Sequence, residues 1–311
     1  MHTGTKIAAF AAAVAATFGT AYGVGSGVGP VTAEAPPAPR HDSAHAQKEQ
    51  THGEAEAGHA GDAVPGGLGD AVPGGLGDAV PGGLQVSERG YSLDLERDRL
   101  PGRTGELRFT IRKDATGAAV TAYRKEHGKE LHLIVVSRDL TGYRHLHPVR
   151  AADGTWSTPV ALPAAGDYRI FADFTPRGEK EGLTLGAGLG VAGRYAPAPL
   201  PAPSATARVP GGYEVRLEGG LKAGAASGLT LRVSKDGRPV TDLQPYLGAY
   251  GHLVALRSGD LAYLHVHPHD GGPGPGVSFT ATAPSTGTYR LFLDFRHGGE
   301  VRTAAFTVHA A

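Results

Sequence analysis

The chain has 311 residues, and its 30 lysines and arginines balance its 30 aspartates and glutamates, which argues against a nucleic-acid partner. The absence of cysteine excludes disulfides, thiol catalysis, iron–sulfur clusters and cysteine-ligated zinc. Met1 is the single methionine, so histidine, with 15 residues, is the transition-metal ligand that the chain offers in quantity.

The first 29 residues combine a short basic head with an apolar segment. Residues 7–28 carry no charge, and an uncharged helix of this length crosses a hydrocarbon layer of about 30 Å. The same pattern is typical of a cleaved signal peptide. We expect an uncleaved signal anchor, because the Ala-x-Ala sequence at Ala33 lies far downstream. Either outcome predicts an extracytoplasmic protein, membrane-anchored or secreted, and the uncleaved helix would make the membrane a partner.

Residues 30–84 show no pattern that would build a core. Their apolar residues are largely alanine, so burial cannot offset the entropy of ordering, and we expect a disordered linker. An octapeptide, Gly-Asp-Ala-Val-Pro-Gly-Gly-Leu, repeats in tandem from Gly61, Gly69 and Gly77, and its Pro-Gly turns favour a flexible spacer. Four histidines here either form a loose metal-collecting tract or are plain spacer residues: His41, His45, His52 and His59.

Residues 85–195 and 210–311 repeat one strand-rich pattern, and a Pro/Ala-rich linker over 196–209 joins them. The alternating stretch at 91–95, Tyr-Ser-Leu-Asp-Leu, matches Tyr-Glu-Val-Arg-Leu at 213–217. No amphipathic helical period follows the N-terminal segment. About seven short strands in about 100 residues, twice, are typical of immunoglobulin-like sandwiches. The sequence therefore predicts an all-β fold of two tandem immunoglobulin-like β-sandwich domains after an N-terminal apolar helix and a disordered linker.

Each repeat carries three histidines with one spacing, the second 13 residues after the first and the third two further on. Histidines two apart on a strand project from one face about 6.6 Å apart, which suits one metal ion held by both imidazoles. A third ligand would come from the neighbouring strand of a β-hairpin. The candidate metal ligands are His132, His145 and His147 in the first repeat, and His252, His265 and His267 in the second.

The hypothesis depends on the length of the hairpin loop. An even number of loop residues puts His132 on the same face as His145 and His147, and in one such register His132 faces His147 directly. An odd number turns His132 to the opposite face and separates the triad.

Several other polar residues stand near these histidines. Asp173 and Asp294 occupy matching positions in the two repeats, where they either orient a metal ligand or make hydrogen bonds at the edge of the core. His269 and Asp270 could extend the second site, whereas His297 has no counterpart and is expected at the surface.

The paired repeats resemble a largely uncharacterised family of bacterial secreted or membrane-anchored envelope proteins with tandem immunoglobulin-like domains. The resemblance spans residues 85–311 and is most specific in the two Tyr-x-His-x-His-Pro hairpins. Some members are suspected of heavy-metal handling. The resemblance implies export and the sandwich fold, and it brings no established activity.

These patterns favour an exported, non-enzymatic envelope protein that binds or buffers a divalent transition metal. Imidazoles without thiolates or thioethers suit Zn²⁺, Cu²⁺ or Ni²⁺ better than Cu⁺. The chain has no His-Glu-x-x-His and no Gly-x-Ser-x-Gly, so a three-histidine metallohydrolase is a third possibility rather than the expected one. The alternative is a structural or protein-interaction module of the cell envelope, with structural histidines and an envelope protein as partner.

Overall fold

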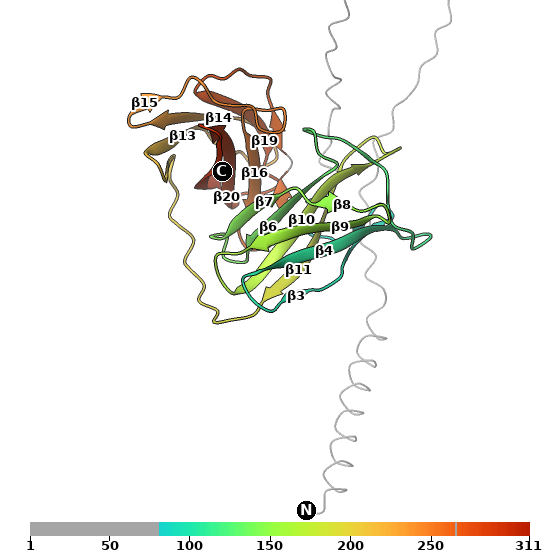
Figure 1. Cartoon of the computed structure of the whole chain (residues 1–311). Helices are drawn as coiled ribbons and strands as arrows, with labels where there is room; N and C mark the ends of the chain where they lie inside the picture. The colour runs from blue at the N-terminus through green and yellow to red at the C-terminus, as the bar shows by residue number, and fades with distance from the viewer. Residues whose placement is uncertain (1–80, 265) are drawn as a thin grey trace, which may run out of the picture. The chain divides into compact units, whose positions relative to one another are not determined.

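The computed structural model describes residues 81–264 and 266–311, and every regular element there is a β-strand (Figure 1). The chain divides into two units, Met1–Asp70 and Ala71–Ala311, and the described residues all belong to the second. The expected apolar N-terminal helix, the histidine tract and most of the expected linker lie outside the described residues. Within the described part of the chain, no helix is long and apolar enough to cross a membrane.

The first repeat forms two sheets, and their inward side chains share one core. Buried residues alternate along the strands, with Leu93 and Phe109 from one sheet packing against Leu133 and Ile170 from the other. One sheet contains, in spatial order, β1 (Ser87–Glu88), β2 (Tyr91–Leu95), β4 (Thr104–Lys113), β9 (Thr155–Ala161) and β8 (Val149–Arg150). The other contains β3 (Arg99–Leu100), β11 (Leu183–Val191), β10 (Gly166–Pro176), β6 (Leu131–Ser137) and β7 (Tyr143–Leu146), with β5 (Tyr123–Arg124) paired to β10.

The second repeat builds a second sandwich with its own core. One sheet contains β12 (Thr206–Val209), β13 (Tyr213–Gly219), β14 (Ala226–Lys235), β19 (Gly276–Thr282) and β18 (Val266–Pro268), with β15 (Arg238–Pro239) paired to β14. The other contains β17 (Tyr263–Leu264), β16 (His252–Arg257), β20 (Gly287–His297) and β21 (Glu300–Ala310). Strand β12 occupies the end of the segment predicted as linker over 196–209, because the alternation that buries Ala207 and Val209 extends the sheet.

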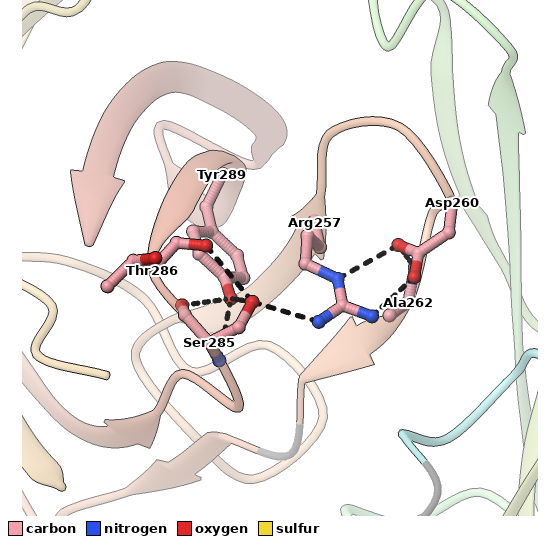
Figure 2. A network of polar contacts seen from close by, with 6 residues as sticks. All are labelled: Arg257, Asp260, Ala262, Ser285, Thr286 and Tyr289. Carbon is pink, nitrogen blue, oxygen red and sulfur yellow. Dashed lines mark hydrogen bonds and ion pairs between the residues drawn. The ribbon is translucent and has the colours of Figure 1, made fainter. Parts of the chain in front are cut away.

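A tyrosine hydroxyl ties a long strand to the preceding corner in each sandwich. Tyr168 donates to the carbonyl of Ala164 at 2.9 Å, and Tyr289 donates to the carbonyl of Ser285 at 2.7 Å (Figure 2). A tyrosine bonded to backbone a few residues upstream is the tyrosine corner of immunoglobulin-like sandwiches. Together with the paired sheets, this hydrogen bond confirms the predicted fold class.

The hairpin loop that follows β6 and its counterpart after β16 have the same length. The amide of Ser137 donates to the carbonyl of Gly142 at 2.8 Å, and that of Arg257 donates to the carbonyl of Ala262 at 2.9 Å. Four residues separate the two bonded residues in each repeat. In the second loop the guanidinium of Arg257 also pairs with the carboxylate of Asp260, which holds the turn (Figure 2).

One apolar cluster draws side chains from both sandwiches. Tyr143 of β7 and Phe292 of β20 stack with ring centroids 4.2 Å apart. Strand β6 is buried on both faces because one faces its own core and the other faces this cluster. That double burial is the physical reason for the nearly continuous apolar run in β6. The buried members of the cluster are Ile134, Val136, Leu140, Tyr143, Phe171, Val254, Leu256, Leu261 and Phe292.

Two glycines at the end of the predicted linker, which was expected to run to residue 84, bond to the sandwiches. Gly83 donates its amide to the carbonyl of Thr184 at 2.7 Å, and the carbonyl of Gly82 accepts from the amide of Tyr263 at 2.9 Å. These bonds contradict the expectation of disorder for the end of the linker, since they satisfy backbone groups on both sandwiches. A Cβ on Gly186 would lie 1.9 Å from the carbonyl oxygen of Gly83, so only glycine fits there.

Candidate metal centre

The first predicted triad assembles on one face of the β6–β7 hairpin. The register pairs Ile134 with His145, and continuing it by two residues sets His132 opposite His147. This is the register that an even loop length predicts, so the prediction for the first hairpin is confirmed. His132 is 9% exposed, and His145 and His147 are half-buried.

The three imidazoles are spaced as rings around one ion would be. One ligand nitrogen from each of His132, His145 and His147 lies within 4.8 Å of the other two. Their ring centroids are 5.3, 5.1 and 4.7 Å apart. Three imidazoles bound tetrahedrally at about 2.0–2.1 Å would have centroids about 5 Å apart. The residues present therefore fit a transition-metal ion without large movement of the rings.

The hydrogen bonds of His132 fix which of its nitrogens carries the proton. Its Nε2 lies 3.2 Å from the carbonyl oxygen of Glu126. Because a carbonyl can only accept, Nε2 is the donor, and Nδ1 has a free lone pair in the neutral ring. Burial, followed by the charge of His145, lowers the pKa of His132 to about 3, so the ring is neutral near pH 7.

Nε2 of His145 faces Nδ1 of His132, and neither nitrogen carries a proton when the rings are neutral. Nδ1 of His145 donates to Oδ2 of Asp294 at 2.9 Å, and its Nε2 lies 3.0 Å from Nδ1 of His132. In each neutral ring the single N–H proton is on the other nitrogen, where it forms a hydrogen bond to Glu126 or Asp294. Two lone pairs therefore face each other across this gap. A proton on His145 or a cation between the nitrogens removes that repulsion.

Asp294 is held in place to accept from His145. Its carboxylate, in β20 of the second sandwich, also accepts from the hydroxyls of Tyr143 at 3.2 Å and Thr303 at 2.5 Å. Burial, followed by the Asp294 charge, raises the pKa of Tyr143 well above 10, so the phenol remains a donor. The second sandwich therefore orients a histidine of the first. A carboxylate that fixes the remote proton of a ligand histidine is a recurring feature of metal sites.

His147 contributes the third free nitrogen. Its Nε2 is buried and has no hydrogen-bond partner among the described residues, while its Nδ1 lies 3.5 Å from the hydroxyl of Tyr246. Burial, followed by the charge of His145, lowers the pKa of His147 to about 3. A buried polar nitrogen without a partner costs about 1–3 kcal/mol, and a metal bond would satisfy it.

The second repeat departs from the predicted hairpin triad. Strand β16 pairs with β17 in the equivalent register, but β17 ends at Leu264, and β18 pairs His267 with Thr280 of the opposite sheet. The prediction that one hairpin carries all three histidines is therefore wrong here, because the chain crosses between sheets earlier than in the first repeat. His265 and the side chain of His267 lie outside the described part of the chain, so their role as ligands stays a prediction.

His252 instead lies beside the first triad. Its ring centroid is 5.9 Å from that of His145 and 6.2 Å from that of His132. Its Nε2 lies 2.8 Å from the carbonyl of Tyr246, and burial lowers its pKa to about 4. The structure thus brings His252 to the histidines of the other repeat.

Sequence reasoning missed His127, whose ring centroid is 5.1 Å from that of His252. Its counterpart in the second repeat is Leu247, so a search for repeated histidines passes over it. The signal available was the Glu-His-Gly turn just before β6, where His127 adopts a φ of 49°. A cavity of about 180 Å³ opens at this point, and its polar lining residues are Glu126, His127, His132, His145, Asp173 and His252.

The remaining predicted polar residues lie elsewhere or act differently. Asp173 accepts from the hydroxyl of Thr184 at 3.0 Å, as its counterpart Asp294 accepts from that of Thr303, while Asp294 also accepts from His145. His269 is exposed and lies 2.7 Å from the Thr280 hydroxyl, outside the triad. His297 was expected at the surface, yet its side chain is only 16% exposed, because it packs against a core tyrosine and pairs with an aspartate.

The fold and the site define a two-domain immunoglobulin-like protein with a histidine triad where its sandwiches meet. The chain belongs to the family described as a domain of unknown function, DUF8832, whose model matches residues 85–185 and 207–311. The two matched segments are the two repeats. Comparison with curated proteins finds no match.

The solved structures that the chain matches include an adhesin, a pair of intimin domains and part of an S-layer protein. The Yersinia pseudotuberculosis adhesin InvE is 12% identical over 70% of this chain and 58% of that chain, with a TM-score of 0.23. The D0-D1 domain of intimin is 10% identical over 70% of this chain and 97% of its own, with a TM-score of 0.22. Domains 5-6 of the S-layer protein SbsC are 12% identical over 70% of this chain and 96% of their own, with a TM-score of 0.22. The chain spans little more than half of the adhesin, and likeness at this level carries no functional argument.

Proposed function

We propose that the chain is an exported, non-enzymatic protein that binds or buffers a divalent transition metal ion through His132, His145 and His147. The observation that carries the proposal is the convergence of three imidazole nitrogens, two of which carry no proton when the rings are neutral. Two face each other at 3.0 Å, and the third is buried without a partner among the described residues. A cation satisfies all three at once.

The ligand set narrows the class of ion. Neutral imidazoles favour Zn²⁺, Cu²⁺ or Ni²⁺, and the chain offers no cysteine and no methionine beyond Met1 for Cu⁺. Asp294, through the remote nitrogen of His145, would hold that ring at the ion and raise its basicity. Binding should weaken in acid, because protons compete with the ion for the imidazole nitrogens. Since burial lowers the pKa of His132 and of His147 to about 3, these two rings stay neutral well below pH 6.5.

The proposed location follows from the sequence alone. The uncharged segment 7–28 favours export and, if it is not cleaved, attachment to a membrane. The absence of cysteine suits a protein exposed to oxidants. An extracytoplasmic metal site built from histidine resists the oxidation that would inactivate a thiolate site.

Calorimetric titration with Zn²⁺, Cu²⁺ and Ni²⁺ tests the proposal. We would use the full chain with His41, His45, His52 and His59 replaced by alanine, called here the tract-free chain, so that the four histidines of the predicted linker contribute no heat. At least one ion should bind with micromolar affinity or better, and His147→Ala should weaken binding at least tenfold. His309→Ala, in the last strand, is the matched control. Absence of micromolar binding, or equal binding by His147→Ala, would eliminate the proposed function.

The second candidate is a structural or protein-interaction module with an envelope protein as partner. It is favoured by the apolar cluster that joins the sandwiches, because buried histidines at such a contact can serve packing and hydrogen bonding alone. In that case the contacts of His145 with His132 and with Asp294 are part of the buried hydrogen-bond network. The same titration separates the candidates, since this module would bind no metal at the triad.

A further inference from the structure

We propose that the second sandwich supplies the fourth ligand of the same ion through Nδ1 of His252, so that one metal is held across both sandwiches. This inference rests on the proposed function and names an additional ligand for its site. It differs from the sequence-based hypothesis, in which His252 belongs to a separate site within its own repeat.

The hydrogen bond that His252 makes identifies which of its nitrogens could bind a metal, as it does for His132. Nε2 of His252 donates to the carbonyl of Tyr246, six residues upstream, as Nε2 of His132 donates to the carbonyl of Glu126. Both carbonyls belong to equivalent turns, since Tyr246 forms a backbone bridge with Ala249 as Glu126 does with Lys129. Nδ1 of His252 therefore has a lone pair and no hydrogen-bond partner among the described residues.

The His252 ring lies slightly farther from the triad than the three rings of the triad lie from one another. Its centroid lies 5.9 Å from that of His145 and 6.2 Å from that of His132, compared with 4.7–5.3 Å within the triad. For these two pairs of rings, the distance exceeds the spacing expected around a tetrahedral ion by about 1 Å. His252 borders the cavity of about 180 Å³ beside the triad, which leaves space next to its ring.

The coordination chemistry leaves room for this ligand. Three imidazoles fill three positions of a tetrahedral site, and a closed site of four protein ligands is typical of structural metal ions, whereas an open position is typical of catalytic ones. A fourth imidazole closes the site.

A ligand from each repeat makes the ion a link between the sandwiches. The second sandwich then contributes both His252 to the ion and Asp294 to His145. An ion that binds only when the sandwiches are docked favours docking by the factor 1 + [M]/Kd, which is about 100-fold at a free metal concentration of 100 Kd. Metal loading would therefore tighten the contact formed by the apolar cluster.

Nitrogen hyperfine structure in the electron paramagnetic resonance spectrum of the Cu²⁺-loaded tract-free chain tests the fourth ligand. We expect four coordinated nitrogens in the parent chain and three in His252→Ala, with at least tenfold weaker Cu²⁺ affinity. The remote control, His309→Ala, should keep four nitrogens and the parent affinity.

The two proposals fail in distinguishable ways. If His147→Ala removes a nitrogen but His252→Ala changes neither the spectrum nor the affinity, the fourth ligand is wrong and the triad stands. If neither variant changes the spectrum, both proposals fall.

Amide hydrogen exchange in the loops 138–141 and 258–261 tests the link itself. Leu140 and Leu261 of these loops belong to the apolar cluster between the sandwiches. Zn²⁺ should slow exchange in both loops of the tract-free chain, up to about 100-fold at 100 Kd. In His252→Ala, Zn²⁺ at the same multiple of that variant's Kd should slow only the first loop. Equal protection of both loops by the variant would overturn the link.

Discussion

At the scale of single residues, the candidate centre can bind a cation because the N–H protons of His132 and His145 lie on the nitrogens that face away from it. The backbone carbonyl of Glu126 accepts a hydrogen bond from Nε2 of His132, and the carboxylate of Asp294 accepts one from Nδ1 of His145. Hydrogen bonds on the outer side of each ring thus expose a lone pair on the inner side. The same side chains with protons on the opposite nitrogens would present donors to the centre and would repel a cation.

Acid should destabilise the metal-free protein through its buried histidines. The folded-state pKa of His132 is lowered to about 3 and that of His252 to about 4, against about 6.5 in the unfolded chain. The unfolded state therefore binds more protons below pH 6.5, and stability is lost as the pH falls from about 6.5 toward 4. Each ring should cost of order 1 kcal/mol at pH 5.5. Urea unfolding of the parent and of His252→Gln at pH 7.5 and 5.5 measures this, and the variant should show the smaller loss. An equal loss in both would show that His252 does not carry the effect.

The carboxylate beneath His145 should matter more than its counterpart in the other repeat. Asp294→Asn removes the negative charge that fixes the remote proton of His145, and metal affinity should fall by about 10–100-fold. Asp173→Asn is the matched control, because Asp173 occupies the equivalent strand position and bonds Thr184. Zn²⁺ titration of the tract-free variants compares the two, and equal affinities would contradict the role assigned to Asp294.

At the scale of elements, the β6–β7 hairpin decides which side chains share a face. An even loop sets the face of His132, and the sequence is sufficient to predict that consequence once the loop length is known. The second hairpin shows the limit of this reasoning. His252 and His267 have the spacing of the first repeat, but spacing does not determine which sheet an edge strand joins, and β18 pairs with β19.

One residue added to the first loop should disrupt the triad. A glycine inserted after Asp139 makes the loop odd, and an odd loop turns His145 and His147 to the face opposite His132 unless a bulge absorbs it. Zn²⁺ affinity of the tract-free chain should drop at least tenfold. A glycine inserted between Gly298 and Gly299, in the turn between β20 and β21, is the control and should leave affinity unchanged. Retained binding with a five-residue first loop would show that the register does not position the ligands.

At the scale of the whole molecule, the contact between the sandwiches assembles a site that neither repeat contains alone. The repeats, the strand pattern and the first triad could be predicted, because each depends on local periodicity and spacing. The contributions of Asp294 and His252 to the other repeat could not, since periodicity tells which face of a strand is apolar and not what covers it. The sequence did carry a sign that β6 is covered on both faces, because its apolar run is too continuous for a strand with one face in water.

The position of Gly82 and Gly83 against the sandwiches should depend on the absence of a side chain at Gly186. In Gly186→Ala the new Cβ would lie 1.9 Å from the carbonyl oxygen of Gly83, so the segment 82–83 must move away. Gly188→Ala, on the same strand, meets nothing within 4 Å and serves as the control. The amide of Tyr263, which donates to Gly82, should exchange faster in Gly186→Ala than in the control. Equal exchange rates would show that the segment is not held there.

The course of Gly82 and Gly83 also has a mechanical consequence. Because these residues bond to Thr184 of one sandwich and to Tyr263 of the other, the chain before them enters at the seam between the domains. Tension applied through that preceding chain would load the two backbone bonds first, before it reached either β-core. Pulling on that preceding chain would thus open the seam beside the histidines while both sandwiches stay folded, and a bound ion that bridges them would raise the force required.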